Sequence, residues 1–284
     1  MQIGLNRCVM HVRRLWQTSL ARAVRLSTVS PVALSIALSA GVGNAWAGRS
    51  CDTEPLKLPA LTQGLGLAER TVKRLNESGA QVMVLARSGQ NLREYGLRYS
   101  HLGLAYKEGD AWRVLHKLNQ CGTDKSSIYR EGIGDFFLDT PYEYVAAVMP
   151  LSAEAQQKLL PLLRNPAPVA ALHTRAYSMV AYPWAQTYQQ SNQWAIELLA
   201  VAMGAELNSR ESAQDWLKEH GYEPTELHLS TLTRLGARLT AANVSFDDHP
   251  SVLRFTGRIR TVTVDSVLAW LQRTGLGGPE WVVR

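Results

Sequence analysis

Two short segments, far apart in the chain, hold side chains suited to nucleophilic and acid–base chemistry. His101 lies in residues 99–103, at the start of an apolar run, and Ser191 opens an amphipathic stretch at residues 191–203. An imidazole that takes the proton of a hydroxyl prepares that oxygen to attack a carbonyl carbon. At a helix N-terminus, the dipole and the free backbone N–H groups would stabilise the resulting anion. These segments therefore indicate a catalytic site.

We predict Ser191 as the nucleophile, His101 as the general base, and His116 as the group that orients the His101 ring, with Asn119 as the alternative for that last role. His116 lies on the return strand of a hairpin that begins at His101, which places the two rings near each other. Each residue also has a structural interpretation. Serine is a preferred N-cap residue, and a strand histidine often bonds a backbone carbonyl. The joint pattern favours a site.

The chain order, with the histidine strand before the nucleophile helix, resembles the circularly permuted, NlpC-type branch of the papain-like superfamily. The segments that carry this resemblance are residues 100–103 and residues 191–194. It implies an α+β, circularly permuted papain-like fold, with an antiparallel sheet packed against helices. Most permuted members have Asn-Cys where this chain has Gln190 and Ser191. A serine must lose its proton to the base as it attacks, whereas a cysteine is partly ionised near neutral pH.

The chain also resembles an uncharacterised group of exported bacterial proteins, a domain of unknown function. The sequence motifs that recur in this group correspond here to residues 96–101, 118–121, 134–137, 191–194 and 247–250. This resemblance implies no reaction. We expect a hydrolase or transferase that acts on amide or ester bonds in the cell envelope. The alternative is a non-catalytic envelope protein that binds peptide, lipid or glycan in the same cleft.

Residues 1–47 have the features of an export signal. They contain five arginines and no acid, then an apolar stretch at residues 32–42, then Ala45-Trp46-Ala47. Basic, apolar and Ala-x-Ala regions in this order are typical of a cleaved signal peptide. The apolar stretch is shorter than the roughly twenty residues that span a bilayer. We therefore predict cleavage before Gly48, no transmembrane segment afterwards, and a periplasmic or secreted protein.

Removal of the signal peptide changes the charge of the chain. The full sequence has 30 Lys and Arg against 24 Asp and Glu, and loss of five arginines leaves 25 bases against 24 acids. A nearly neutral domain offers no basic surface for nucleic acid. Residues 48–284 contain no linker, repeat or low-complexity block, so we predict a single domain. The sequence does not predict a cofactor, a metal or an oligomeric state.

Two cysteines remain after cleavage, Cys51 and Cys121. In an oxidising compartment such a pair is usually bridged, so we predict a disulfide between them. The alternative is that Cys121 is a reactive thiol. Its surroundings, residues 119–123, have the composition of a turn rather than of a helix start, which favours the bridge.

The hydrophobic pattern predicts a mixture of helices and antiparallel strands. Helices are expected at residues 67–78, 152–160, 191–203 and 209–220, and a final helix is expected to run from a cap at Asp265 to Thr274. Strands are expected at residues 80–87, 101–106, 112–118 and 258–264. Pro161 should end or kink the second helix. Residues 122–141 are predicted to be irregular and to form one wall of the cleft, with Tyr129, Arg130, Phe136 and Phe137.

Two further patterns provide rival hypotheses. Residues 247–249, Asp-Asp-His, are potential metal ligands together with His228 or His173, and Asp248 with His249 is an alternative partner for Ser191 in a Ser-His-Asp triad. Such a segment is more often a turn. Aromatic residues near the nucleophile helix could line a binding groove, although Trp194 on the helix is better explained by core packing. These are Tyr177, Tyr182, Trp184, Tyr188 and Trp194.

Overall fold

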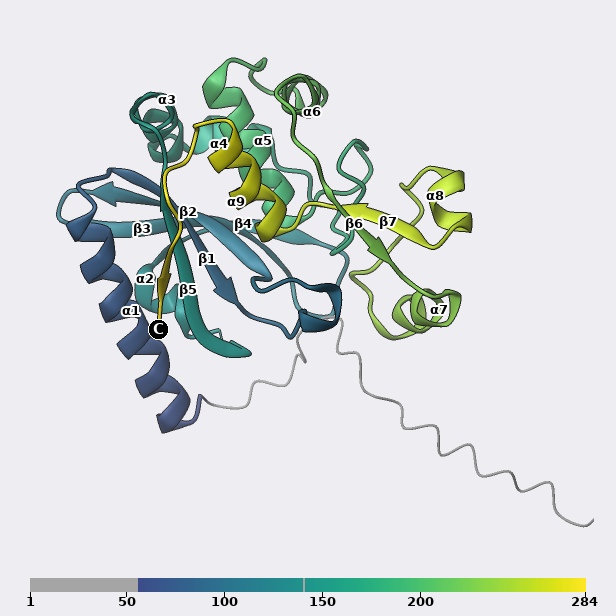
Figure 1. The fold of residues 1–284 in the computed structure, drawn as a ribbon, viewed down its shortest axis with the longest axis horizontal. Coiled ribbons are helices and arrows are strands. Elements are labelled where there is room, and N and C mark those ends of the chain that lie inside the picture. The colour runs from purple at the N-terminus through teal and green to yellow at the C-terminus, as the bar shows by residue number, and fades with distance from the viewer. Residues whose placement is uncertain (1–55, 140) are drawn as a thin grey trace, which may run out of the picture. The chain divides into compact units, whose positions relative to one another are not determined.

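A computed structural model describes residues 56–139 and 141–284. Its centre is a six-stranded antiparallel sheet with the strand order β4-β3-β2-β1-β5-β8 (Figure 1). These strands are β1 (Val82–Ser88), β2 (His101–Glu108), β3 (Ala111–Asn119), β4 (Ser126–Gly132), β5 (Glu143–Pro150) and β8 (Trp281–Val283). A separate two-stranded sheet pairs β6 (Thr225–His228) with β7 (Arg258–Thr261).

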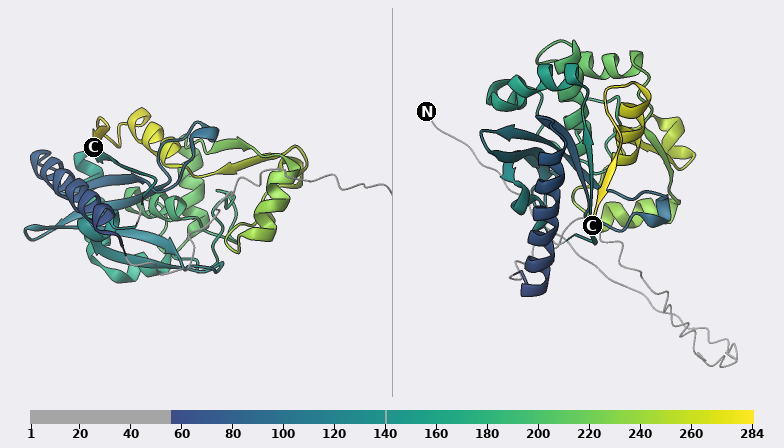
Figure 2. Two further views of the ribbon diagram at one scale, coloured as in Figure 1. Left: turned by 90° about the horizontal axis from the view of Figure 1, so that it is seen from below. Right: turned by 60° about the vertical axis from the view of Figure 1, so that its left-hand side comes forward.

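Helices cover both faces of the large sheet. On one face lie α1 (Leu58–Glu77) and α2 (Ile133–Phe137). The other face is covered by α3 (Ala153–Arg164), α5 (Ser191–Met203) and α9 (Val264–Arg273), with α4 (Pro166–Ala171) and α6 (Arg210–Glu219) packed nearby (Figure 2). Because both faces are covered, β1 is buried along its whole length. The predicted α+β class, with an antiparallel sheet packed against helices, is confirmed.

The predicted hairpin of β2 and β3 is present. Its turn contains Gly109 at a φ of 61°, a left-handed conformation that glycine adopts without strain. The two strands pair from Glu108 with Ala111 to Leu104 with Leu115, and pairing stops there. Below this point β2 remains paired with β1, through Arg87 and His101. The hairpin is therefore open at the end where the two histidines lie.

Several predicted boundaries are confirmed and others are corrected. Helix α5 has the expected limits, and Ser152 caps α3 as its position suggested, but α3 continues through Pro161 to Arg164. The N-cap of α9 is Thr263, whose hydroxyl accepts from the Ser266 N–H, so the prediction of a cap at Asp265 is wrong. Pro161 is tolerated inside α3 because it lies in the last turn of that helix.

The interpretation of residues 122–141 as irregular is wrong. They contain β4 and α2, and β4 pairs with β3 along its whole length. The side chains of β4 are mostly half-exposed or exposed on both faces. Its sequence therefore shows no clear alternation of apolar and polar residues, which is the pattern that predicts a strand. Phe136 and Phe137 are fully buried, and their rings pack edge to face in the core beneath α1.

A small cluster forms around the second sheet. It comprises β6, β7, α7 (Thr231–Thr240) and α8 (Ser251–Phe255), and Figure 1 shows these elements grouped beyond β4 and α5. Its buried core consists of Ala241, Val244, Phe246 and Ile259. In the part of the chain that the structure describes, no helix has the length and apolar character needed to cross a membrane.

The predicted signal peptide and Cys51 lie outside the described residues. Cys121 is disulfide-bonded. The alternative of a free, reactive Cys121 thiol is therefore wrong.

Candidate acid–base site

The structure brings the two predicted histidines into direct contact. His101 Nε2 and His116 Nδ1 are 2.8 Å apart, and the two residues are 8% and 1% exposed. His101 begins β2 and His116 lies near the end of β3, where the hairpin is open. The expected pairing of a histidine with an orienting polar ring is therefore present in the geometry.

A third residue, Glu131, extends this contact. Its Oε2 lies 2.9 Å from His116 Nε2. Tyr129 of β4 is directly opposite His116, and Glu131, two residues further on, is the diagonal neighbour on the same face of the sheet. The sequence analysis missed Glu131 because it did not recognise β4. A strand at residues 126–132 would have placed this carboxylate beside His116.

The hydrogen bonds define where the protons lie. The Glu131 carboxylate accepts, so His116 carries its proton on Nε2 and offers a lone pair at Nδ1. His101 must then donate from Nε2 to that lone pair. Its own Nδ1 is left unprotonated, and no hydrogen bond occupies it among the residues that the structure describes. This assignment follows from the network and yields a base at His101 Nδ1.

The electrostatic environment keeps both rings neutral. Burial lowers the pKa of His101 well below its ordinary value, and the charge of Arg87 and the neighbouring His116 lower it further. Burial also lowers the pKa of His116, although the hydrogen bond to Glu131 and its charge partly oppose this. The bond to His116 lowers the pKa of Glu131. At neutral pH the three groups are therefore a carboxylate and two uncharged imidazoles.

Two neighbours explain why the rings can meet. A Cβ on Gly103 would lie 2.5 Å from Val114 Cγ1 and 3.1 Å from His116 Cβ, so a glycine is needed for β3 to approach β2 here. On the same face the ring of Phe136 contacts both imidazoles, at centroid distances of 5.8 and 5.3 Å. The predicted contribution of Phe136 to the site wall thus takes the form of an apolar floor under the rings.

Ser191 is not the N-cap of α5. Gln190 is the cap, because its side chain accepts from the N–H groups of Asn192 and Gln193, and Gln193 bonds back to the Gln190 N–H. Ser191 is the first helical residue, 5% exposed, and its hydroxyl donates to the Tyr177 hydroxyl at 3.4 Å. The capping interpretation of Ser191 is therefore wrong, and the hydroxyl has no role in starting the helix.

Ser191 and the two histidine rings lie on opposite faces of the large sheet, because the rings pack on Phe136 of α2 whereas α5 covers the other face. Asn192 Oδ1 accepts from the Leu102 N–H at 3.0 Å, which ties the first turn of α5 to the residue after His101. Within the described residues no hydrogen bond joins Ser191 to His101 or His116, and the Ser191 N–H has no acceptor. Asn119 donates to the carbonyls of Thr123 and Lys125, so it is not the orienting group.

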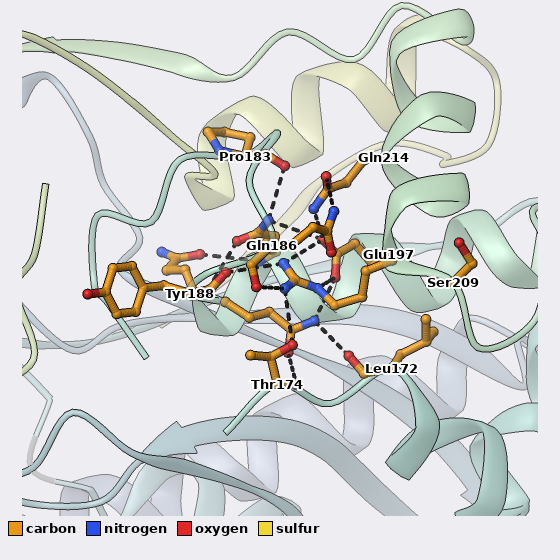
Figure 3. Close-up of polar contacts among 12 residues, drawn as sticks. Leu172, Thr174, Pro183, Gln186, Tyr188, Glu197, Ser209 and Gln214 are labelled. Carbon is orange, nitrogen blue, oxygen red and sulfur yellow. Dashed lines mark hydrogen bonds and ion pairs between the residues drawn. The ribbon is translucent and has the colours of Figure 1, made fainter. Parts of the chain in front are cut away.

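A buried polar network holds the start of α5 in place (Figure 3). Glu197, fully buried in α5, accepts from Arg210 of α6 at 2.9 and 3.1 Å, and also from three glutamine side chains. These are Gln189, Gln193 and Gln214. Arg210 also donates to the carbonyls of Gln186 and Tyr188 in the loop before α5. The loop that presents Ser191 is thus bonded to both helices.

A cavity of about 690 Å³ opens at the end of β1. Ser88, one of its lining residues, follows Arg87, whose register partner is His101. The cavity therefore lies at the same end of the sheet as the histidines, although their rings do not line it. Its polar lining includes Gln90, Arg93, Arg98 and Glu143.

The rival hypotheses for residues 247–249 are not supported. His249 is buried, with Nδ1 3.0 Å from Asp248 Oδ1 and Nε2 2.9 Å from the Arg260 carbonyl, so neither nitrogen is open to Ser191 or to a metal. His228 Nε2 lies 3.8 Å from Glu226 Oε1. In the described ranges no group of three or more His, Cys, Asp or Glu side chains is placed to hold a metal ion.

The aromatic side chains near α5 are largely used for packing. Trp194 is fully buried in the core, as its helical position indicated, and Tyr177 is 7% exposed. Trp184 is partly buried and packs edge to face on Tyr222. Tyr182, which contacts His249, and Tyr188 are half-buried, so part of their surface remains exposed beside the loop before α5.

The fold and site together define an α+β protein in which a Glu-His-His chain lies under the open end of a central antiparallel hairpin. The chain belongs to a family described as "Uncharacterized protein conserved in bacteria (DUF2145)", whose model matches residues 74–271. That range contains all three members of the Glu-His-His chain as well as Ser191. No curated protein and no solved structure matches the chain significantly.

Proposed function

We propose that this protein is a hydrolase or transferase that acts on amide or ester bonds in the cell envelope. The observation that carries the proposal is the chain from Glu131 through His116 to His101, which leaves an unprotonated His101 Nδ1. A buried, neutral and oriented imidazole is the general base that acyl transfer requires. The catalytic residues in this proposal are Ser191 and His101, and His116 and Glu131 are positioning residues.

The proposed reaction requires the start of α5 to shift around the end of β2, because Ser191 and the His101 ring lie on opposite faces of the sheet in this structure. Ser191 Oγ then leaves Tyr177 and attacks the carbonyl carbon of the substrate. Its proton passes to His101 Nδ1, and the oxyanion that forms accepts a hydrogen bond from the unpaired Ser191 N–H. Collapse breaks the amide or ester bond, and His101 returns the proton to the leaving amine or alcohol. Water or a second acceptor, deprotonated by the same imidazole, then releases the acyl group from Ser191.

The proposal includes the circularly permuted papain-like fold and an extracytoplasmic location. It is supported by the histidine hairpin that precedes the nucleophile helix, by the contact between Asn192 and the Leu102 N–H, and by the export-type features of residues 1–47. The substrate in this proposal is a peptide, lipid or glycan of the envelope. The cavity beside Ser88 is at the correct end of the sheet to receive part of it.

One observation favours a second candidate function, non-catalytic binding in the same cleft. Ser191 bonds Tyr177 and lies on the opposite face of the sheet from the His101 ring, so the nucleophile and the base are not joined. If the side chain keeps that position, the site binds an envelope ligand without chemistry.

Labelling with a serine-reactive fluorophosphonate distinguishes the two functions. Wild type should be labelled, and Ser191→Ala and His101→Gln should each lose the label because the first lacks the nucleophile and the second the base. Glu131→Gln keeps an acceptor for His116 and should be labelled more slowly. The matched control is Ser209→Ala, which removes the N-cap of α6 and should keep the label.

If wild type is not labelled, or if Ser191→Ala still is, the enzyme proposal is wrong. In the first case, pull-down of envelope ligands with wild type and Ser191→Ala would test the binding function. Binding should survive the substitution, because it needs no nucleophile.

A further inference from the structure

The small cluster around β6 and β7 carries the most exposed large apolar side chains of the described residues. Phe255 and Val252 of α8 are 88% and 73% exposed, and Leu232 of α7 is 81% exposed. Leu235, one turn further along α7, is 54% exposed. Single exposed apolar residues are normal on a protein surface, but four on two neighbouring helices indicate a binding surface. We call these four residues the α7–α8 patch.

Two large apolar residues of α7 face solvent rather than the protein. A surface helix normally turns its large apolar side chains toward the protein. In α7 the small Ala237 packs against the cluster core, while Leu232 and Leu235 point to solvent. Leu232 therefore contributes little to the fold of this chain, and the exposed parts of both leucines cost free energy in water unless another surface covers them.

The two helices are held together, so the patch is a defined surface. The Arg234 guanidinium on α7 donates to the Arg254 carbonyl on α8, and the Leu229 N–H donates to the Gly257 carbonyl at 2.9 Å. Gly257 adopts a φ of 73°, and an added Cβ would lie 2.9 Å from the Leu229 carbonyl oxygen. Glycine is thus required where the end of α8 meets the start of α7.

Positive charge accompanies the apolar side chains. Residues 226–260 contain five arginines against three acids. One acid, Asp248, has a fully buried side chain against His249. Arg254 lies 3.9 Å from Asp247 and Arg258 lies 3.5 Å from Glu226, but the two arginine side chains remain 37% and 52% exposed, and the arginines of the segment outnumber its acids. Leucine, valine and phenylalanine beside exposed arginines match the two layers of a lipid surface, in which acyl chains lie beneath anionic headgroups.

We propose that the α7–α8 patch docks this protein onto the surface of a membrane that contains anionic lipid. Phe255, Val252 and Leu232 would enter the boundary between headgroups and acyl chains, and Arg254 and Arg258 would contact lipid phosphates. The inference does not depend on the acid–base site, because the patch lies on different elements. It describes peripheral binding by side chains at one end of the molecule.

Flotation of the purified protein with vesicles tests this proposal. Vesicles of phosphatidylcholine with phosphatidylglycerol should carry wild type to the top of a gradient, and pure phosphatidylcholine vesicles should carry much less. Leu232→Ser combined with Phe255→Ser should weaken binding by about a hundredfold or more, because two large apolar side chains that enter the lipid are lost together. Arg254→Glu combined with Arg258→Glu should abolish the preference for anionic vesicles.

The control is Leu65→Ser, which changes a half-exposed leucine on α1, outside the patch. It should bind like wild type. All forms must share the same N-terminus, checked by mass spectrometry, because residues 32–42 are themselves apolar. Thermal unfolding should be alike in all variants, since the substituted side chains are exposed.

The proposal is overturned if wild type fails to bind anionic vesicles, or if the Leu232 and Phe255 variant binds as well as wild type. Sedimentation of the free protein supplies a further check. A dimer that the same two substitutions convert to a monomer would show that a second copy covers the patch, which also overturns membrane docking.

Discussion

Lys117 is a basic side chain with no exposed surface. Its Nζ donates to the Thr174 carbonyl at 2.8 Å and to Gln189 Oε1 at 2.7 Å. Burial lowers the pKa of Lys117 to about 6, and the charge of Arg210 contributes to this shift. A neutral amine has two N–H groups, which match the two acceptors, whereas an ammonium would have one donor without a partner.

The buried Lys117 should make stability depend on pH. Its pKa is about 6 in the folded protein and 10.5 in the unfolded chain, so between these values only the unfolded chain binds the proton. The free energy of unfolding should therefore rise as pH rises through this window. Lys117→Met, which keeps the length without the charge, should flatten that rise. Urea unfolding at pH 7 and pH 9 measures this rise in the free energy of unfolding. An equal rise in wild type and in Lys117→Met would contradict the lowered pKa of Lys117.

At the residue scale, the sequence predicted the side chains that are brought together by one hairpin, and it missed one that is brought to them by pairing with a further strand. His101 and His116 were predicted together because they lie on one hairpin. Glu131 was missed, since its place beside His116 depends on β4, a strand without clear alternation. The hydroxyl of Ser191 bonds Tyr177, a contact that depends on a loop conformation that no local pattern encodes.

At the element scale, the start of α5 is fixed by ionic and amide groups that are buried together. Glu197 accepts from Arg210 and three glutamines, so the carboxylate is fully hydrogen-bonded in the core. Removing one partner of such a pair leaves the other charge buried without compensation. Helix α5 itself was predicted with correct limits from its apolar length, but this network joins three segments distant in sequence, and local periodicity does not report it.

Glu197→Gln should destabilise the protein by about 3 to 5 kcal/mol, because the buried Arg210 guanidinium loses its anion and the new amide N–H₂ faces other donors. The matched control is Glu154→Gln, which removes the exposed pair with Lys158 and should cost less than about 1 kcal/mol. Chemical denaturation of both variants gives the comparison. Similar losses in the two would show that the network contributes no more than a surface ion pair.

At the scale of the whole molecule, the two sheets differ in the size of the cores that support them. The six-stranded sheet is buried on both faces, whereas β6 and β7 rest on the four buried residues of the small cluster. Local opening requires less free energy where fewer apolar contacts are lost. The cluster was also the least predictable part of the fold. Of its elements only β7 was expected, and α7 exposes Leu232 and Leu235, which helical periodicity would place inside.

Hydrogen exchange should therefore proceed faster in β6 and β7 than in β1 and β2. The amides that pair Leu227 with Ile259 are expected to exchange through local opening, and those that pair Val84 with Leu104 only through global unfolding. Exchange measured by mass spectrometry at increasing denaturant separates the two mechanisms. Equal protection in both sheets would mean that the cluster and the large sheet open as one cooperative unit.

The strand order has a consequence for how the chain is made. β5 lies between β1 and β8, and Val148 pairs with both Leu85 and Trp281. During synthesis one side of β5 gains its neighbour early, while the other must wait until Trp281 has emerged. Throughout that interval an apolar strand presents unpaired N–H and C=O groups, which other chains can join. Protection of this edge by a chaperone should therefore increase the yield of folded protein.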